Sequence, residues 1–257
     1  MRQCTLPNSG IHAGNLILVN SRYQYREPVP PNLVPIGETG PQVKLNRRAA
    51  ALFSELMQKI GGYGQIVPVS GFRTRKEQQA IWDGSLRENG GAFTRKYVAA
   101  PGHSEHETGL AIDLGLRKDK IDFIRPDFPY NGICDIFREN AAKYGFIERY
   151  PAGKESVTNI GHEPWHFRYV GVPHALVMRE NGLTLEEYIG ALRGCPYGKQ
   201  PLRYQNNGLC AAVSYLRASR GKTTAFEIEA DLPYSVSGDN IEGFVITEWR
   251  GAHERQK

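Results

Sequence analysis

The sequence has no long apolar run. Near the N-terminus the longest one is Leu16 to Val19, which is shorter than the roughly seven apolar residues of a secretory signal. No other stretch approaches the ~18 apolar residues that a membrane-spanning helix needs. We therefore expect a protein that is neither exported nor anchored by a membrane span, and that works in the cytoplasm.

Cysteine is scarce and dispersed. The four cysteines, which lie far apart, are Cys4, Cys134, Cys195 and Cys210. None forms a Cys-x-x-Cys pair, so the sequence indicates neither a zinc knuckle nor a catalytic cysteine. In a reducing compartment they are expected to be free thiols that serve mostly in packing.

Charge of one sign is not concentrated anywhere. The 32 Lys and Arg exceed the 27 Asp and Glu, which gives a net charge of +5. No basic run carries interleaved aromatic residues, so a nucleic-acid partner is not expected. A diffuse positive excess of this size is compatible with a small anionic substrate. The chain also lacks internal repeats and low-complexity tracts.

Hydrophobic periodicity predicts a mixture of helices and strands. Helices are expected at 45–60, 75–84, 134–144, 174–181 and 185–192, with a capping box of Thr74 and Glu77 before the second and a loop from its end to His103. Strands are expected at 16–19, 66–73, 109–116, 146–150, 166–171, 211–216, 224–230 and 243–249. Helices grouped around a mostly antiparallel sheet indicate an α+β fold.

A change in composition at 194–202, GCPYGKQPL, predicts a domain boundary. The main domain is expected to span 1–193, and 194–257 is expected to form a small, β-rich C-terminal extension. This extension is too short for a second catalytic domain and contains no cluster of acids and histidines. Its role is left open by the sequence.

His106 and Asp113 lie in the segment PGHSEHETGLAIDLG. Catalytic zinc sites combine three imidazole or carboxylate ligands with a water molecule. Seven residues apart, the two side chains would point to opposite faces of one continuous strand, so we expect Gly109 to let the chain turn. His106 then lies at the loop edge, while Ile112 and Leu114 face the core. An Asp inside a buried strand is costly unless it is paired or bound to a cation, which favours a metal site.

Glu163 and His166 are three residues apart in GHEPWHFRYVG. On a helix this spacing would suit a di-iron bundle, but Pro164 and the run HFRYV favour a turn that enters a strand. His166, at the start of that strand, is then the candidate third ligand. Glu163 would be near the metal without binding it, where a general base can take a proton from water.

Arg73 lies at a strand-to-helix corner in SGFRTRKEQQ, where a guanidinium can pair with a carboxylate or a developing oxyanion. Other residues of the same types have ordinary interpretations. Structural roles are expected for His12, His174 and His253, and surface positions for Arg75 and Arg168. Structural roles are also preferred for His103 and His162, which flank the two motifs and could tune the ligands.

Taken together, SGFR with Gln78, the run SEHETGLAID from Ser104 to Asp113, and EPWH from Glu163 to His166 resemble the D-alanyl-D-alanine metallopeptidases. This family includes VanX and VanY and shares the lysostaphin and hedgehog fold. The resemblance covers 14–190. It is strongest to bifunctional VanXY members of the VanG type, through GNLILVN, PVSGFR, IDFIRPDFPYNGICD and EPWHFRYVG, and continues weakly into the tail through VSGDNIEGFVITEWR.

The resemblance implies a role for each motif residue. It implies Zn²⁺ bound by His106, Asp113 and His166. It further implies Glu163 as catalytic base, Arg73 as the oxyanion partner, and contacts from Ser104 and Gln78 to the carboxyl-terminal residue of the substrate. The implied activity is hydrolysis of D-Ala-D-Ala and of the terminal D-Ala of cytoplasmic peptidoglycan precursors, which removes the target of vancomycin.

Two alternatives remain at this point. One is a phage-type endolysin peptidase on the same fold, although the tail does not resemble a wall-binding repeat. The other is a non-catalytic, hedgehog-like zinc-binding module, which would have no need for Glu163 and Arg73. The balance of dipeptidase and carboxypeptidase activity, the tolerance for D-Ser or D-lactate ends and the oligomeric state are left open.

Overall fold

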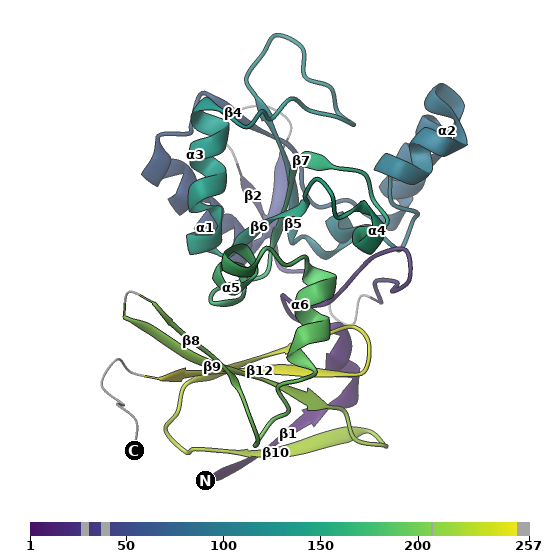
Figure 1. The fold of residues 1–257 in the computed structure, drawn as a ribbon. Helices are drawn as coiled ribbons and strands as arrows, with labels where there is room; N and C mark the ends of the chain where they lie inside the picture. Colours follow the sequence, from purple (N-terminus) through teal and green to yellow (C-terminus); the bar gives the residue numbers. More distant parts are fainter. Residues whose placement is uncertain (27–30, 37–41, 207, 251–257) are drawn as a thin grey trace. The chain divides into compact units, whose positions relative to one another are not determined.

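The computed structural model describes residues 1–26, 31–36, 42–206 and 208–250 (Figure 1). The chain divides into two compact units, one made of Met1–Leu18 with Leu185–Lys257 and the other of Val19–Thr184. The N-terminal segment and helix α6 (Leu185–Leu192) thus group with the C-terminal strands. A domain boundary after residue 193 stays a prediction.

The unit 19–184 is built on an antiparallel four-stranded sheet of order β4-β5-β7-β6. Its strands are β4 (Ile66–Ser70), β5 (Ala111–Leu116), β6 (Phe146–Tyr150) and β7 (Glu163–Tyr169). A separate hairpin pairs β2 (Leu33–Ile36) with β3 (Val43–Asn46). These strands and the helices around them confirm the α+β prediction.

Five α-helices and two short 3₁₀ turns accompany this sheet among the described residues. The helices are α1 (Arg47–Ile60), α2 (Arg75–Tyr97), α3 (Gly132–Ala141), α4 (Glu155–Thr158) and α5 (His174–Asn181). The 3₁₀ turns are η2 (Glu105–Thr108) and η3 (Ala142–Tyr144). The capping box predicted for α2 is present, with Thr74 and Glu77 bonded reciprocally.

One face of the sheet is covered by α1 and α3 (Figure 1). The core on this side contains several aromatic side chains. The ring of Phe137 on α3 lies 4.8 Å from that of Phe167 on β7, measured between centroids, and 6.2 Å from that of Phe53 on α1. Ile112 and Leu114 belong to the same core. Because side chains alternate along a strand, Asp113 faces the opposite side of the sheet, as predicted.

Helix α2 is longer than predicted. A loop was expected from about residue 85, but the helix continues to Tyr97 across a kink at Gly90, which has a φ of 79°. Thr94 Oγ1 donates to the Gly90 carbonyl at 2.9 Å and lies 2.8 Å from Ser85 Oγ. These buried hydroxyls tie the two halves of the helix together and account for its continuation through a glycine-rich stretch.

The strand predicted at 16–19 was wrong. These four residues are buried but belong to none of the strands of the described chain. The Leu16 amide instead donates to Ser237 Oγ at 2.9 Å, and the Leu18 amide to the Asp239 carbonyl at 3.1 Å. The apolar run therefore indicates buried residues, but they do not form a strand.

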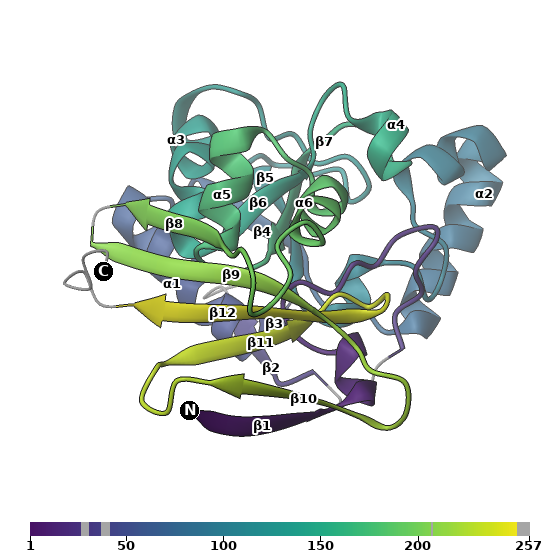
Figure 2. The ribbon, with the colours of Figure 1, turned by 60° about the horizontal axis from the view of Figure 1, so that its bottom comes forward.

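The other unit contains two sheets (Figure 2). The four-stranded sheet has the order β11-β12-β9-β8, and β1 pairs with β10. The strands are β1 (Arg2–Pro7), β8 (Leu202–Asn206), β9 (Leu209–Arg217), β10 (Thr223–Ile228), β11 (Tyr234–Gly238) and β12 (Gly243–Arg250). A 3₁₀ turn, η1 (Asn8–His12), follows β1. The three strands predicted in the tail are β9, β10 and β12.

None of the helices in the described ranges combines the length and apolarity that crossing a bilayer requires.

Gly71, just after β4, has no room for a side chain. A Cβ there would lie 2.4 Å from the backbone oxygen of Lys44, which accepts the Phe72 amide. Gly71→Ala should therefore lower the free energy of unfolding by about 1–3 kcal/mol. Gly84→Ala is the matched control, because the nearest described atom lies 3.9 Å away within α2, and it should raise stability by up to about 1 kcal/mol. Urea unfolding measures both, and equal effects would contradict this packing.

Candidate active site

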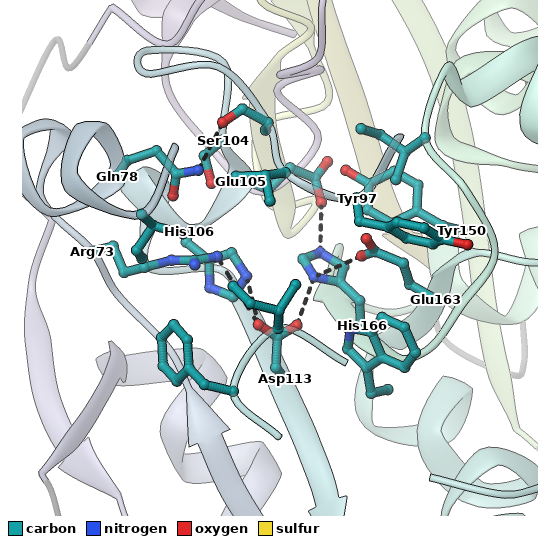
Figure 3. Close-up of a pocket in the computed structure, with 17 residues that line it drawn as sticks. Arg73, Gln78, Tyr97, Ser104, Glu105, His106, Asp113, Tyr150, Glu163 and His166 are labelled. Atoms are coloured by element: carbon teal, nitrogen blue, oxygen red, sulfur yellow. Dashed lines mark hydrogen bonds and ion pairs between the residues drawn. The ribbon is translucent and has the colours of Figure 1, made fainter. Parts of the chain in front are cut away.

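A single pocket in the unit 19–184 gathers every residue that the sequence analysis assigned to the site (Figure 3). They are Arg73, Gln78, Ser104, His106, Asp113, Glu163 and His166. The residues come from the segment after β4, from α2, from η2 with the residue before it, and from strands β5 and β7. The structure therefore brings the three sequence motifs to one place, while the role of each residue stays a prediction.

The register of β5 with β7 places Asp113 directly opposite His166. Residues opposite one another in an antiparallel pair project to the same face. His166 Nδ1 accordingly lies 2.8 Å from Asp113 Oδ1. His166 was expected at the start of its strand, but β7 begins three residues earlier, at Glu163, which pairs with Tyr150 beyond an irregularity in β6.

His106 reaches the same point from η2. That turn ends at Gly109, whose φ of 70° is the left-handed conformation expected for the reversal of the chain. The Nδ1 of His106 lies 2.7 Å from the Gly71 carbonyl, to which it donates. This hydrogen bond fixes the ring proton on Nδ1. The lone pair of Nε2, which is 3.1 Å from Asp113 Oδ2, is then available to bind a metal ion.

The three side chains suit a metal ion. Ligand atoms of His106, Asp113 and His166 all lie within 4.8 Å of one another, and all three residues are buried. Two imidazole nitrogens and one carboxylate oxygen form a donor set typical of catalytic zinc, which keeps a further position for water. The carbonyl of Gly71 behind His106 is the kind of outer partner that orients a ligating imidazole.

The surroundings give these candidate ligands suitable charges. Burial, with Arg73 adding to it and Asp113 opposing, lowers the pKa of His106 to about 4, so the ring is neutral. Burial would raise the pKa of Asp113, but His106 and His166 outweigh it and hold it below its usual range. Burial would lower the pKa of His166, but the neighbouring carboxylates of Asp113 and Glu105 outweigh it and raise the pKa to about 9. A metal ion would take the place of this extra proton.

Glu163 differs from Asp113 in its protonation. Burial, and next the nearby Asp113 carboxylate, raise the pKa of Glu163 to about 8 against the opposing effects of His166 and Arg73. Its Oε2 lies 3.8 Å from His166 Nδ1, and it lines the same pocket as the three candidate ligands. Two neighbouring carboxyls with pKa values moved in opposite directions indicate one ligand and one acid–base group.

Three further predicted residues line the pocket with polar atoms. Arg73 Nη2 lies 4.0 Å from Asp113 Oδ2, and its Nε is buried with no hydrogen-bond partner in the described ranges. Gln78 donates through Nε2 to the Ala99 carbonyl at 2.7 Å, while its Oε1 accepts no hydrogen bond from any described group. Ser104 is 2 % exposed. These unused atoms could contact a bound molecule.

Glu105 also lines the pocket but was not predicted as a site residue, and the prediction for Arg168 was wrong. Arg168 was expected at the surface, but it is fully buried, with Nη1 2.8 Å from Glu105 Oε1. The alternation of side chains along β7 could have indicated this position, because Arg168 is two residues beyond His166 and lies on the same face of the strand. The pKa of Glu105 is lowered, because Arg149 and Arg168 outweigh the effect of burial.

The remaining histidines of the described chain do not line this pocket. His103 Nδ1 lies 2.7 Å from the Asn20 carbonyl, and His162 Nε2 lies 2.7 Å from the Tyr130 hydroxyl. His174 is buried, and burial lowers its pKa to about 3. His12 lies 2.7 Å from Asn240 Oδ1. His253 lies outside the described residues.

A family model and several curated proteins match much of this chain. The family model of VanY, described as D-alanyl-D-alanine carboxypeptidase, matches residues 42–172. The bifunctional D-Ala-D-Ala dipeptidase and carboxypeptidase VanXYC of Enterococcus gallinarum is 43% identical over 67% of this chain and 92% of its own length. A D-alanyl-D-alanine carboxypeptidase of Enterococcus faecium is 31% identical over 96% of this chain and 79% of its own length.

Solved structures extend the likeness. The vancomycin-resistance D,D-dipeptidase VanXYg, in complex with a D-Ala-D-Ala phosphinate analogue, is 48% identical with a TM-score of 0.94, covering 97% of this chain and 99% of its own. A VanY D,D-pentapeptidase in complex with Zn(II) is 31% identical with a TM-score of 0.58, covering 68% and 98%. The resemblance inferred from the motifs is thereby confirmed. This chain belongs to the VanY family of D-alanyl-D-alanine peptidases.

Proposed function

We propose that this chain is a zinc-dependent D,D-peptidase that hydrolyses D-Ala-D-Ala and the terminal D-Ala of cytoplasmic peptidoglycan precursors. Such an activity would remove the precursors that vancomycin recognises. The observation that carries the proposal is the meeting of His106, Asp113, His166, Glu163 and Arg73 in one pocket. The near full-length likeness to VanXYg, bound to a D-Ala-D-Ala analogue, supports the substrate class.

His106, Asp113 and His166 would hold the zinc ion. When bound, zinc lowers the pKa of water and polarises a carbonyl group. Glu163 would take the proton of the attacking water on its carboxylate and deliver it to the leaving amine. Burial raises its pKa to about 8, and a dication nearby would lower it, so that the base is ionised at neutral pH.

Arg73 would stabilise the oxyanion that develops as the scissile carbonyl is attacked. Its buried Nε has no partner among the described groups, and a guanidinium can present two parallel donors to such an oxygen. Ser104 and Gln78 would bind the carboxyl-terminal residue of the substrate, because both line the same pocket and Gln78 Oε1 is unused by described groups.

The direct test is release of D-alanine by purified, metal-analysed protein. We expect about one zinc per chain, activity on both D-Ala-D-Ala and a pentapeptide ending in it, and loss of activity with a chelator that added zinc reverses. The physical reason is the single three-ligand cluster found among the described residues. Full hydrolysis by metal-free protein would refute the metal assignment, and no hydrolysis of either substrate by zinc-loaded protein would refute the proposed activity.

Substitutions of Glu163 and of His166 should have different effects on zinc content. Glu163→Gln keeps all three ligands and removes the proton acceptor, so zinc should stay while turnover falls by a factor of roughly 10²–10⁴. His166→Ala removes a ligand, so zinc affinity and turnover should fall together. Metal analysis after dialysis and D-alanine release measure both. Loss of zinc from Glu163→Gln would make Glu163 a ligand, and full turnover in that variant would exclude Glu163 as the catalytic base.

Arg73→Lys should slow the reaction strongly. An ammonium cannot reproduce the planar pair of donors, and loss of an oxyanion donor costs about 3–4 kcal/mol of transition-state stabilisation, or a hundredfold or more in turnover. Arg75→Lys is the matched control, since its side chain is 53% exposed and pairs with Glu107. Unchanged turnover in Arg73→Lys would remove Arg73 from the catalytic machinery.

A further inference from the structure

Glu105 is a buried carboxylate for which the mechanism above has no use. Its side chain is 0% exposed, and its Oε1 accepts the Arg149 Nε–H at 2.8 Å. Arg168 Nη1 lies 2.8 Å from the same oxygen. Both cations therefore contact Oε1, and Oε2 is left without a hydrogen-bond partner in the described part of the chain.

The free oxygen of Glu105 faces a metal-ligand candidate. His166 Nε2 lies 3.6 Å from Glu105 Oε2, just beyond hydrogen-bond distance, and within the described ranges it too has no hydrogen-bond partner. Buried polar atoms without partners are costly, so two that face one another across so short a gap indicate an intended pair. Figure 3 shows the ring of His166 between Glu105 on one side and Asp113 on the other.

The two nitrogens of His166 therefore have different neighbours. Nδ1 is turned toward Asp113 Oδ1 at 2.8 Å, which is the side where the three ligand candidates meet, and Nε2 is turned away toward Glu105. A metal on Nδ1 requires the ring proton to be on Nε2. A carboxylate acceptor at Nε2 stabilises that tautomer and holds the ring in orientation.

We propose that Glu105 is a positioning residue for the metal centre, which accepts the Nε2–H of His166 and so directs the Nδ1 lone pair at the metal. This inference rests on the proposed zinc site and adds a residue outside the three ligands. Arg149 and Arg168 keep the carboxylate in place through Oε1, and their two contacts leave Oε2 for His166.

Glu105→Gln would keep the shape of the side chain but replace the hydrogen-bond acceptor that faces His166 with a donor. Its amide oxygen would turn to the guanidinium donors of Arg149 and Arg168, and its NH₂ group would face His166. A donor at that place favours Nε2 as an acceptor and moves the ring proton to Nδ1, where the metal has to bind. Glu105→Gln should therefore weaken zinc binding even in a folded protein.

A purely structural role of Glu105 predicts a different effect on zinc binding. If Glu105 only neutralises the two arginines, its substitution changes stability without a selective effect on the metal. Glu107→Gln is the matched control, because Glu107 is a buried acid of the same 3₁₀ turn. Its described contacts are Arg75 Nε at 3.3 Å and the Gly102 amide at 2.6 Å, both away from the ligand histidines.

The experiment measures zinc affinity of the full chain by competition with a chromophoric chelator at fixed pH. We expect Glu105→Gln to bind zinc about 10–100-fold more weakly than the unsubstituted protein, and Glu107→Gln to bind it about as tightly. Unchanged affinity in Glu105→Gln, or equal losses in both variants, would overturn the inference. If the unsubstituted protein did not bind zinc, the proposed function would fall together with this inference. Failure of the Glu105 inference alone is therefore distinguishable from failure of the proposed function.

A second measurement uses the unsubstituted protein, so it does not depend on whether a Glu105 variant folds. In zinc-loaded protein labelled with ¹⁵N-histidine, the His166 ring, assigned by loss of its signals in His166→Ala, should show zinc on Nδ1 and a proton on Nε2. Zinc on Nε2, or an Nε2 without a proton, would overturn the role of Glu105 whatever the affinities are.

Discussion

The pairing of Asp113 with His166 across β5 and β7 is the constraint on which the pocket depends. A slip of one residue would turn Asp113 into the aromatic core and bring Ile112 to the pocket face. Ile112 and its partner Phe167 on β7 prevent this, because both are fully buried in that core. The packing of one face of the sheet therefore sets the chemistry of the other.

The pocket collects charges that are costly to bury alone. Asp113, Glu105 and Glu163 are all buried, and the cations beside them are arginines and a protonated His166. The free energy of desolvating such groups is recovered only when they are well paired. A dication bound at the three ligands would displace the proton of His166 and supply the missing positive charge, so metal binding and stability of this unit are expected to be linked.

How much the sequence predicts depends on whether the signal is local. The turn at Gly109, the alternation along β5 and the capping box of α2 are set by neighbouring residues, and all were foreseen. The seven pocket residues were found because their types and order follow a known motif. The strand-like run at 16–19 and the continuation of α2 past Gly90 depend instead on distant partners, such as Asp239, and on buried hydroxyls. Arg168 was misjudged because its partner, Glu105, is remote in sequence.

The pairing of β1 with β10 has a consequence for how the chain is made. Arg2 lies opposite Ile228, so the first strand is synthesised more than two hundred residues before its partner. At about 5–20 residues per second, β1 waits roughly 10–45 s with an unpaired edge, while all of 19–184 emerges and can fold. Unpaired edges are prone to join other chains. The polar alternation of β1, RQCTLP, with Arg2 and Gln3 exposed, suits a strand that must stay in solution during that interval.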